Sequence, residues 1–294
     1  MHEFTENDLI NFLPQFETFV GIDSDGCVFD TMDTKQKDFF HPHIIRNWGL
    51  EAIETEVRAA AEFTFLYSCY RGLNRFLGLC RTFELLLDWP QACNKAAIPD
   101  PADLRAYCDS GLPLSNATCK AEAERTGSEL LAQAHRWSIE LNKDIDANMP
   151  DPPAFEGAED ALKQIQKNSD AVVMSQTQAV ALLKDWHRDN LARYVRVIAG
   201  PEIGSKVDCF TMAAAERYPE KAILMIGDAT GDLTTAQTLG CCFYPIIPGQ
   251  EIESWQRFIN EAYARFLDGS FSDDYQKQLI HEFKAKLPET PPWK

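Results

Sequence analysis

Two aspartates, Asp23 and Asp25, follow the apolar run Phe19–Ile22 and are separated by a single serine. A short apolar run that ends at turn residues is typical of a buried strand, and Gly26 predicts a sharp turn directly after it. Such a turn can direct both carboxyl groups at one substrate, so that one acts as a nucleophile and the other as a general acid and base. An acidic turn that only ends a strand is the simpler alternative.

Three later segments carry further groups with the same placement. Ser175 ends a second apolar run, Lys206 follows a glycine turn and opens a helical stretch, and Asp228 and Asp232 follow a third apolar run. In an open α/β sheet, ligands bind at the carboxyl ends of the strands. The order of nucleophile pair, hydroxyl, lysine and acidic pair therefore favours one shared site, although each residue alone can also be a strand-end cap or a solvated side chain.

With these four segments in this order, the chain resembles the haloacid dehalogenase-like (HAD) hydrolase superfamily. The resemblance covers roughly residues 16–248, except for an insertion after the first strand. It implies an α/β fold, with a Rossmann-like parallel sheet core and an inserted all-helical cap domain of the C1 type.

The resemblance also implies a role for each residue. Asp23 would be the nucleophile that forms an aspartyl-phosphate, and Asp25 would protonate the leaving oxygen and later deprotonate the attacking water. Ser175 would hydrogen-bond a phosphoryl oxygen. Gln176 and Thr177 follow it directly in the sequence, and they are weaker candidates for lining the substrate site. Lys206 would hold Asp23 ionised and bind the transferring group.

A magnesium ion is the implied cofactor, because Mg²⁺ prefers oxygen ligands in octahedral geometry. By resemblance its ligands would be the carboxylates of Asp23 and Asp228 and the backbone carbonyl of Asp25. Asp232 lies four residues after Asp228, and it would bind the metal through water or orient Lys206.

Asp25 narrows the reaction within this superfamily. Haloalkanoate dehalogenases lack a carboxylate at this position, and phosphonatases carry a small residue there and use a lysine of the cap. The resemblance therefore implies a Mg²⁺-dependent phosphohydrolase that acts on a small phosphorylated metabolite. A phosphomutase of the same superfamily and a non-catalytic binding protein on a HAD scaffold stay open as alternatives.

Composition limits the partners that can be expected. The chain has 294 residues and a net charge of −17 at pH 7, which argues against nucleic-acid binding as its main activity. No apolar run is long enough to span a membrane, and residues 1–6 do not resemble a signal peptide. Nine cysteines without a CxxC pair indicate a reduced, cytoplasmic protein. The oligomeric state stays open between a monomer and a homodimer.

The pattern of elements predicts three regions. Residues 1–31 and 152–250 alternate strands and helices and form the α/β core, residues 32–151 form the helical cap, and residues 251–294 form a C-terminal helical extension packed on the core. Within the cap we expect helices over residues 51–70 and 74–87. We also expect one long helix that starts after Ser115 and continues to about Asn148.

Substrate choice is expected to reside in the cap. If residues 71–75 are helical, Arg71, Asn74 and Arg75 share one face and can clamp a second anionic group. Surface arginines paired with glutamates are the alternative. Basic residues near the start of the cap, Lys35, Lys37, His41 and His43, are further candidates. Cys27 is close to the nucleophile pair, but we interpret it as a small packed residue rather than a redox switch.

Overall fold

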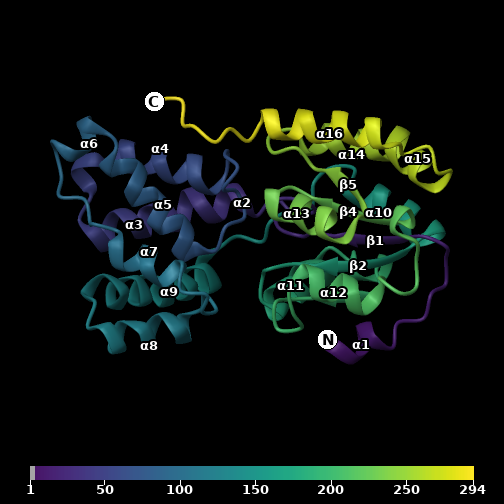
Figure 1. Ribbon diagram of the computed structural model, residues 1–294, viewed down its shortest axis with the longest axis horizontal. Helices are drawn as coiled ribbons and strands as arrows, with labels where there is room; N and C mark the ends of the chain where they lie inside the picture. The colour runs from purple at the N-terminus through teal and green to yellow at the C-terminus, as the bar shows by residue number, and fades with distance from the viewer. Residues whose placement is uncertain (1–3) are drawn as a thin grey trace. The chain divides into compact units, whose positions relative to one another are not determined.

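The computed structural model describes residues 4–294 and divides the chain into two compact units (Figure 1). The core unit comprises Asp151–Lys286 and the described part of Met1–Thr31, and the helical unit comprises Met32–Pro150 and Leu287–Lys294. The sequence prediction places the second boundary one residue later. It also treats residues 251–294 as one extension of the core, whereas the structure divides this stretch after Lys286.

The core unit is built on a five-stranded sheet in which every neighbouring pair of strands is parallel. The strand order is β3-β2-β1-β4-β5, so β1 lies at the centre. The strands are β1 (Phe19–Ile22), β2 (Asp170–Met174), β3 (Val197–Ala199), β4 (Ile223–Gly227) and β5 (Cys242–Pro245). The prediction of an α/β fold with a parallel sheet is confirmed.

Helices cover both faces of this sheet (Figure 1). Val20 and Ile22 point to the face where α10, α11, α14 and α15 pack, while Phe19 contacts Phe12 and Phe210 on the other face. The helices of the core unit are α1 (Glu6–Ile10), α10 (Ala158–Asn168), α11 (Ala179–Arg188), η3 (Ala192–Tyr194), α12 (Lys206–Ala213), η4 (Glu220–Ala222), α13 (Thr230–Leu239), α14 (Glu251–Arg257), η5 (Phe258–Ala262), α15 (Tyr263–Leu267) and α16 (Asp273–Ala285).

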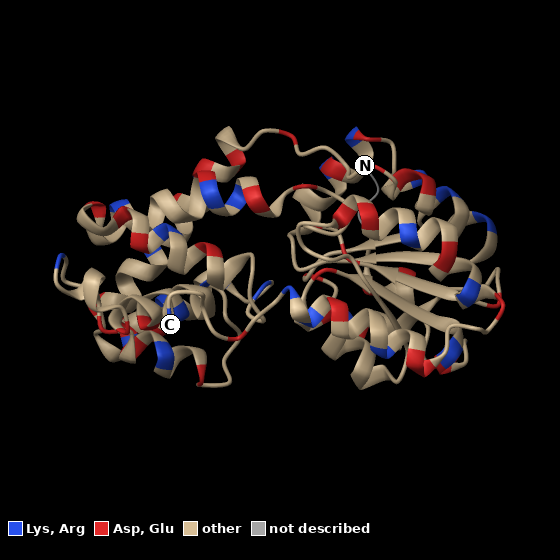
Figure 2. Cartoon of the chain, turned by 90° about the horizontal axis from the view of Figure 1, so that it is seen from above, with Lys and Arg blue, Asp and Glu red and all other residues tan. Residues whose placement is uncertain are grey.

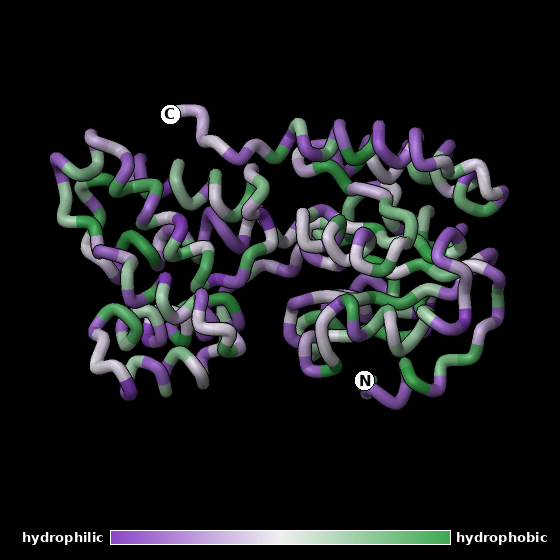
Figure 3. The backbone as a smooth tube through the Cα atoms, in the orientation of Figure 1, coloured by the Kyte–Doolittle hydropathy of each residue, from purple (hydrophilic) through white to green (hydrophobic). Residues whose placement is uncertain are grey.

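Burial explains the composition of the strands. All residues of β1, β2 and β4 are buried, as expected for a parallel sheet covered on two faces. Figure 3 shows the same pattern, with apolar strands in the core unit and alternating polar and apolar stretches along α16. Removing this apolar surface from water is the main force that holds the sheet and its helices together.

The helical unit has an apolar core of its own, in which Trp137 is fully buried and contacts Phe40 at a ring distance of 5.9 Å. Its helices are α2 (Met32–Thr34), η1 (Lys35–Phe40), α3 (His41–Trp48), η2 (Glu51–Ile53), α4 (Glu54–Phe65), α5 (Arg75–Leu87), α6 (Pro90–Cys93), α7 (Ala102–Cys108), α8 (Asn116–Thr126) and α9 (Glu129–Asn148).

Two helix predictions in this unit are wrong in extent. The helix expected over residues 51–70 is the short η2 followed by α4, which ends at Phe65. The long helix expected after Ser115 is divided into α8 and α9. Gly127 adopts a left-handed conformation (φ 71°) that ends α8, and the Ser128 hydroxyl accepts a hydrogen bond from the backbone N–H of Leu131 and caps α9.

The last residues of the chain pack on the helical unit. Trp293 stacks on Trp89 with 4.5 Å between ring centroids, and it contacts the edge of Phe63 at 5.7 Å. The backbone N–H of Cys69 donates to the Pro288 carbonyl at 3.3 Å. These contacts explain why Leu287–Lys294 belong to the helical unit.

Charged residues occur on helices of both units (Figure 2). Among residues 4–294, no helix has both the length and the apolar character needed to cross a bilayer.

Candidate active site

Three adjacent strands, β1, β2 and β4, bring predicted site residues together at the carboxyl end of the sheet. Asp23 directly follows β1, Ser175 follows β2 and Asp228 follows β4. Both neighbours are in register with β1, because Ile22 pairs with Val173 on one side and with Ile226 on the other. Parallel pairing therefore places the carboxyl ends of the three strands side by side.

The loop after β1 is held in a compact turn. The carbonyl of Ser24 accepts hydrogen bonds from the backbone N–H groups of Val28 at 2.8 Å and Phe29 at 3.1 Å. Gly26 has a φ of 75°, which a residue with a side chain adopts only with strain. Trp186 from α11 donates its indole N–H to the Ser24 hydroxyl at 3.0 Å. This turn fixes the backbone between Asp23 and the next residues of the loop.

Asp23 and Lys206 form a buried ion pair. The Nζ atom of Lys206 lies 3.0 Å from Oδ2 of Asp23 and also contacts Oδ1 of Asp232. Lys206 is the first residue of α12, and this helix begins there because Ser205 and Asp208 form a reciprocal cap. The lysine therefore enters the site from a helix terminus whose position is fixed locally.

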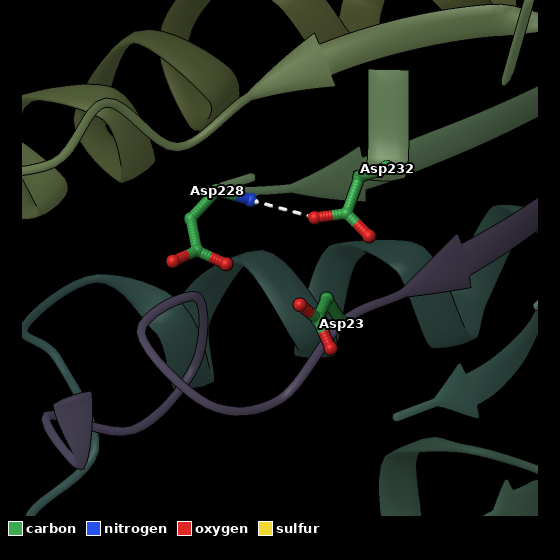
Figure 4. Close-up of side chains that lie close together, drawn as sticks. All are labelled: Asp23, Asp228 and Asp232. Atoms are coloured by element: carbon green, nitrogen blue, oxygen red, sulfur yellow. Dashed lines mark hydrogen bonds between the residues drawn. The ribbon is translucent and has the colours of Figure 1, made fainter. Parts of the chain in front are cut away.

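The Asp232 side chain holds the backbone that follows β4 in place (Figure 4). Its Oδ2 atom accepts hydrogen bonds from the backbone N–H groups of Asp228 at 3.2 Å and Ala229 at 3.1 Å. Gly227 makes this approach possible, because a Cβ atom there would lie only 2.3 Å from Cγ of Asp232. The glycine before the acidic pair is thus a steric requirement for the position of Asp232.

The three carboxylates form a group with the character of a metal site. One carboxylate oxygen from each of Asp23, Asp228 and Asp232 lies within 4.8 Å of the others, and all three residues are buried. Together with the Lys206 ammonium, these groups carry a net charge of −2 when all are ionised. Burying such a charge is costly unless a cation balances it, and oxygen donors suit a hard divalent cation. Both oxygens of Asp232 already accept protein hydrogen bonds, and those of Asp23 are contacted by the backbone N–H of Ser24 and by Lys206, so a bound cation would share these oxygens with the protein.

The crowding of these charges shifts the pKa values of Asp23 and Lys206. Burial raises the pKa of Asp23 well above its usual range, Lys206 opposes that shift, and the neighbouring carboxylates of Asp232 and Asp228 reinforce it. Burial alone would lower the pKa of Lys206, but Asp23 and Asp232 raise it above its ordinary value. Lys206 is therefore a permanent cation in this site, and a bound metal ion would favour the ionised form of Asp23 in the same way.

The hydroxyl of Ser175 lies in a tight turn at the end of β2. The backbone N–H of Ser175 donates to the Ala199 carbonyl at 3.0 Å, and its Oγ atom accepts from the backbone N–H of Thr177 at 3.1 Å. Gln176 between them is exposed. Thr177 also donates its hydroxyl to Oδ2 of Asp25 at 2.6 Å, which joins the turn after β2 to the loop after β1.

The three substrate-binding candidates of the helical unit do not form a helical face. Arg71 lies in the turn between α4 and α5, where it is buried and donates to the Leu66 carbonyl at 3.0 Å. Asn74 caps α5 by accepting from the N–H of Phe76 at 2.9 Å. The premise of one helical face carrying all three residues is therefore wrong, because α5 begins only at Arg75.

Arg75 points into the helical unit itself. Its guanidinium donates to Oγ of Ser138 at 2.9 Å and to Oδ1 of Asn142 at 2.6 Å, and it lies 5.5 Å from the ring centroid of Phe40. Burial lowers the pKa of Arg75 to about 10. These contacts give Arg75 a packing role in the unit, and a substrate contact for Arg71, Asn74 or Arg75 stays a prediction.

Two of the basic candidates near the start of the helical unit, Lys37 and His43, have partners within that unit. Lys37 pairs with Asp33 at 2.7 Å, and His43 hydrogen-bonds Asp144 at 2.7 Å. His41 is buried, and burial lowers its pKa to about 3. In the core unit, Cys27 is fully buried, and burial followed by the charge of Asp228 raises the pKa of its thiol. A raised pKa disfavours the reactive thiolate, which supports a packing role for Cys27.

Three residues near the site hold its parts in place, and of these the sequence singled out only Thr177, as a weaker candidate beside Gln176. Thr177 bonds the carboxyl group of Asp25, Gly227 leaves room for Asp232, and Trp186 holds the turn at Ser24. The sequence contained a weak signal for Thr177, which lies two residues after a strand-end serine, where such hydroxyls often form local turns. Nothing local indicated Trp186, since its partner is 162 residues away.

Comparison with proteins of known structure finds several hydrolases. A haloacid dehalogenase-like family hydrolase from Xanthomonas campestris matches with a TM-score of 0.48 and 12% identity, covering 88% of this chain and 94% of that one. A HAD-superfamily hydrolase from Geobacter sulfurreducens matches with a TM-score of 0.40 and 12% identity, covering 79% and 90%. The HAD-hydrolase YfnB from Bacillus subtilis, whose structure holds magnesium, matches with a TM-score of 0.43 and 14% identity, covering 84% and 100%.

The chain is similar to HAD-superfamily hydrolases. No protein-family model matches the sequence, and no curated protein matches it either. Because the TM-scores lie below 0.5 and the identities at 12–14%, an assignment of activity depends on the geometry of the site.

Proposed function

We propose that this chain is a metal-dependent phosphohydrolase of the HAD type, which cleaves phosphate monoesters through an aspartyl-phosphate on Asp23. One observation carries the proposal. The Asp23 carboxylate lies at the carboxyl end of the central strand, 3.0 Å from the Lys206 ammonium. Two more buried carboxylates, those of Asp228 and Asp232, lie beside it. A nucleophilic carboxylate needs such positive charge beside it, because phosphate esters repel anions.

In the first step an oxygen of Asp23 attacks phosphorus, and the bond between phosphorus and the leaving oxygen breaks. The leaving oxygen keeps the electron pair and takes a proton from Asp25, so that an alcohol departs. In the second step Asp25 takes a proton from water, and the water oxygen attacks phosphorus. The bond to Asp23 breaks, inorganic phosphate departs and both carboxyl groups return to their initial states.

A bound divalent cation, for which we propose Mg²⁺, would neutralise charge on the phosphoryl oxygens and orient them toward Asp23. Asp23 and Asp228 would hold it, and Asp232 would orient Lys206 and the backbone of Asp228. Lys206 binds the transferring group through its remaining N–H donors, and Ser175 has its hydroxyl hydrogen left to donate to a phosphoryl oxygen.

We propose a small phosphorylated metabolite as the substrate, and the cytoplasm as the compartment. The nine cysteines are all unpaired, which suits a reducing environment. The helical unit is inserted directly after the loop that carries Asp25, and we propose that it is the cap that selects the substrate.

Phosphate release from a panel of phosphorylated metabolites and p-nitrophenyl phosphate tests the proposal. We expect release with Mg²⁺, none with EDTA and none from the Asp23→Asn variant. Asp273→Asn is the matched control, because this aspartate of the core unit is exposed and pairs with the exposed Lys221. A wild-type protein that releases no phosphate from any ester contradicts the proposal, and transfer without net release would indicate a phosphomutase.

A further inference from the structure

Thr177 connects two of the proposed catalytic residues. Its hydroxyl donates to Oδ2 of Asp25 at 2.6 Å, and its backbone N–H donates to Oγ of Ser175 at 3.1 Å. Asp25 comes from the loop after β1, and Ser175 comes from the end of β2. One residue therefore sets the relative position of a carboxyl group and a hydroxyl group that are distant in sequence.

The bond to Asp25 has a clear physical effect. Asp25 is half-buried, and it lies on a loop rather than on a strand. Its carboxyl group can rotate about two side-chain bonds, and each hydrogen bond that it accepts favours some orientations over others. The hydrogen bond from the Thr177 hydroxyl favours the orientation in which Oδ2 of Asp25 faces Thr177.

We propose that Thr177 is a positioning residue that orients the Asp25 carboxyl group for proton transfer to the leaving oxygen. This inference rests on the proposed function. With the Thr177 hydroxyl on Oδ2, Oδ1 is the oxygen that carries the proton in the first step. The proton moves from Oδ1 to the leaving oxygen as the bond from that oxygen to phosphorus breaks, and the pair of electrons from the O–H bond stays on Asp25.

The backbone N–H of Thr177 completes the arrangement. Because this group donates to Oγ of Ser175, the Ser175 hydroxyl hydrogen points away from this N–H and is left to donate to another acceptor. The turn after β2 thus positions both the Ser175 hydroxyl, which would contact the phosphoryl group, and the carboxyl group of Asp25, which Thr177 orients. Correct placement of an acid relative to the bond that breaks is worth several orders of magnitude in rate.

Two substitutions distinguish the effect of the Thr177 hydroxyl from that of the rest of its side chain. Thr177→Val keeps the branched shape and the backbone N–H but removes the donor to Asp25, whereas Thr177→Ser keeps the donor. The readout is kcat/KM for two aryl esters of similar shape, phenyl phosphate and p-nitrophenyl phosphate. Phenol is the poorer leaving group and depends more on a proton from Asp25.

We expect Thr177→Val to lower kcat/KM about tenfold to a hundredfold for phenyl phosphate and less than about threefold for p-nitrophenyl phosphate. Thr177→Ser should recover most of the loss. In an Asp25→Asn background the valine substitution should have little further effect, because the acid that Thr177 orients is then absent.

An equal loss for both esters, or a full loss in the Asp25→Asn background, would assign Thr177 a purely structural role and overturn the inference. Thermal unfolding of each variant shows whether a loss reflects damage to the fold. Failure of the proposed function is a different result, since wild type would then release no phosphate from either ester, and that outcome overturns both.

Discussion

Replacement of Gly227 by alanine tests whether close packing at the end of β4 sets the position of Asp232. The added Cβ atom would lie 2.3 Å from both Cγ and Oδ2 of Asp232. Real Cβ contacts are not this short, so the carboxylate or the strand end must move. Movement of Asp232 breaks its hydrogen bonds to the backbone of Asp228 and Ala229 and its contact with Lys206.

The size of the effect follows from these contacts. Adding a methyl group to a packed interior costs about 1–3 kcal/mol, and each lost hydrogen bond to a charged group costs about 1.5–3 kcal/mol before water compensates. We expect a net loss of about 2–4 kcal/mol from the free energy of unfolding of the core unit. For a unit of this size the loss corresponds to a drop in Tm on the order of 10 °C.

The assay combines thermal unfolding with hydrogen–deuterium exchange and phosphate release. Exchange should increase in the peptide that spans residues 223–239, and kcat/KM should fall at least about tenfold, because Lys206 loses a partner that orients it. Gly231→Ala is the matched control, since a Cβ atom there meets no atom within 4 Å. In the helical position of Gly231, alanine should stabilise the protein by about 0.5–1 kcal/mol.

Equal stability of wild type and the Gly227→Ala variant, with unchanged turnover, would refute the steric argument. So would an equal loss in the Gly231→Ala control, because the effect would then belong to any added methyl group in this segment.

Two further predictions concern the helical unit. Burial lowers the pKa of His41 to about 3 in the folded protein; the charges of Arg58 and Lys37 add to this shift, and Asp33 opposes it. In the unfolded chain the pKa is about 6.5. Because the unfolded state binds the proton first, stability falls as pH drops below about 6.5, by about 2 kcal/mol between pH 7 and pH 5. Urea unfolding at pH 7 and pH 5 should show this loss in wild type and a smaller loss in His41→Gln. An equal change in the free energy of unfolding with pH in both proteins would contradict the role given to His41. Trp293→Ala should cost about 1–2 kcal/mol through the lost contacts with Trp89 and Phe63, whereas Lys294→Ala, whose pair with Asp88 is exposed, should cost less than about 0.5 kcal/mol. Equal losses in the two variants would show that the ring contacts add nothing.

Local chemistry made part of the fold predictable from the sequence. Ser115 caps a helix as expected, because a side-chain oxygen that accepts a backbone N–H acts within three residues. Gly127 and Ser128 carry an equally local signal for the break between α8 and α9. The apolar periodicity across that break was regular enough to suggest one helix, and the stop signal was overlooked.

Contacts between distant segments could not be predicted in the same way. Thr177 and Asp25 are 152 residues apart, and only the pairing of β1 with β2 brings them together. The stacking of Trp293 on Trp89 likewise joins two residues that are far apart in the sequence. The six proposed catalytic and metal-binding residues of the core unit were identified because each follows an apolar run or a glycine turn. The contacts that orient them depend on side-chain geometry that such patterns do not contain.

The central claim is that Asp23 carries the phosphoryl group. The most direct measurement is rapid acid quenching of wild type during turnover of p-nitrophenyl phosphate with Mg²⁺, followed by mass spectrometry of peptides. We predict a phosphorylated peptide that contains Asp23 and maps to that residue after reduction of the acyl phosphate, and no phosphorylated peptide from Asp23→Asn. A phosphoryl group on another residue, or phosphate release that persists in Asp23→Asn, would contradict the account.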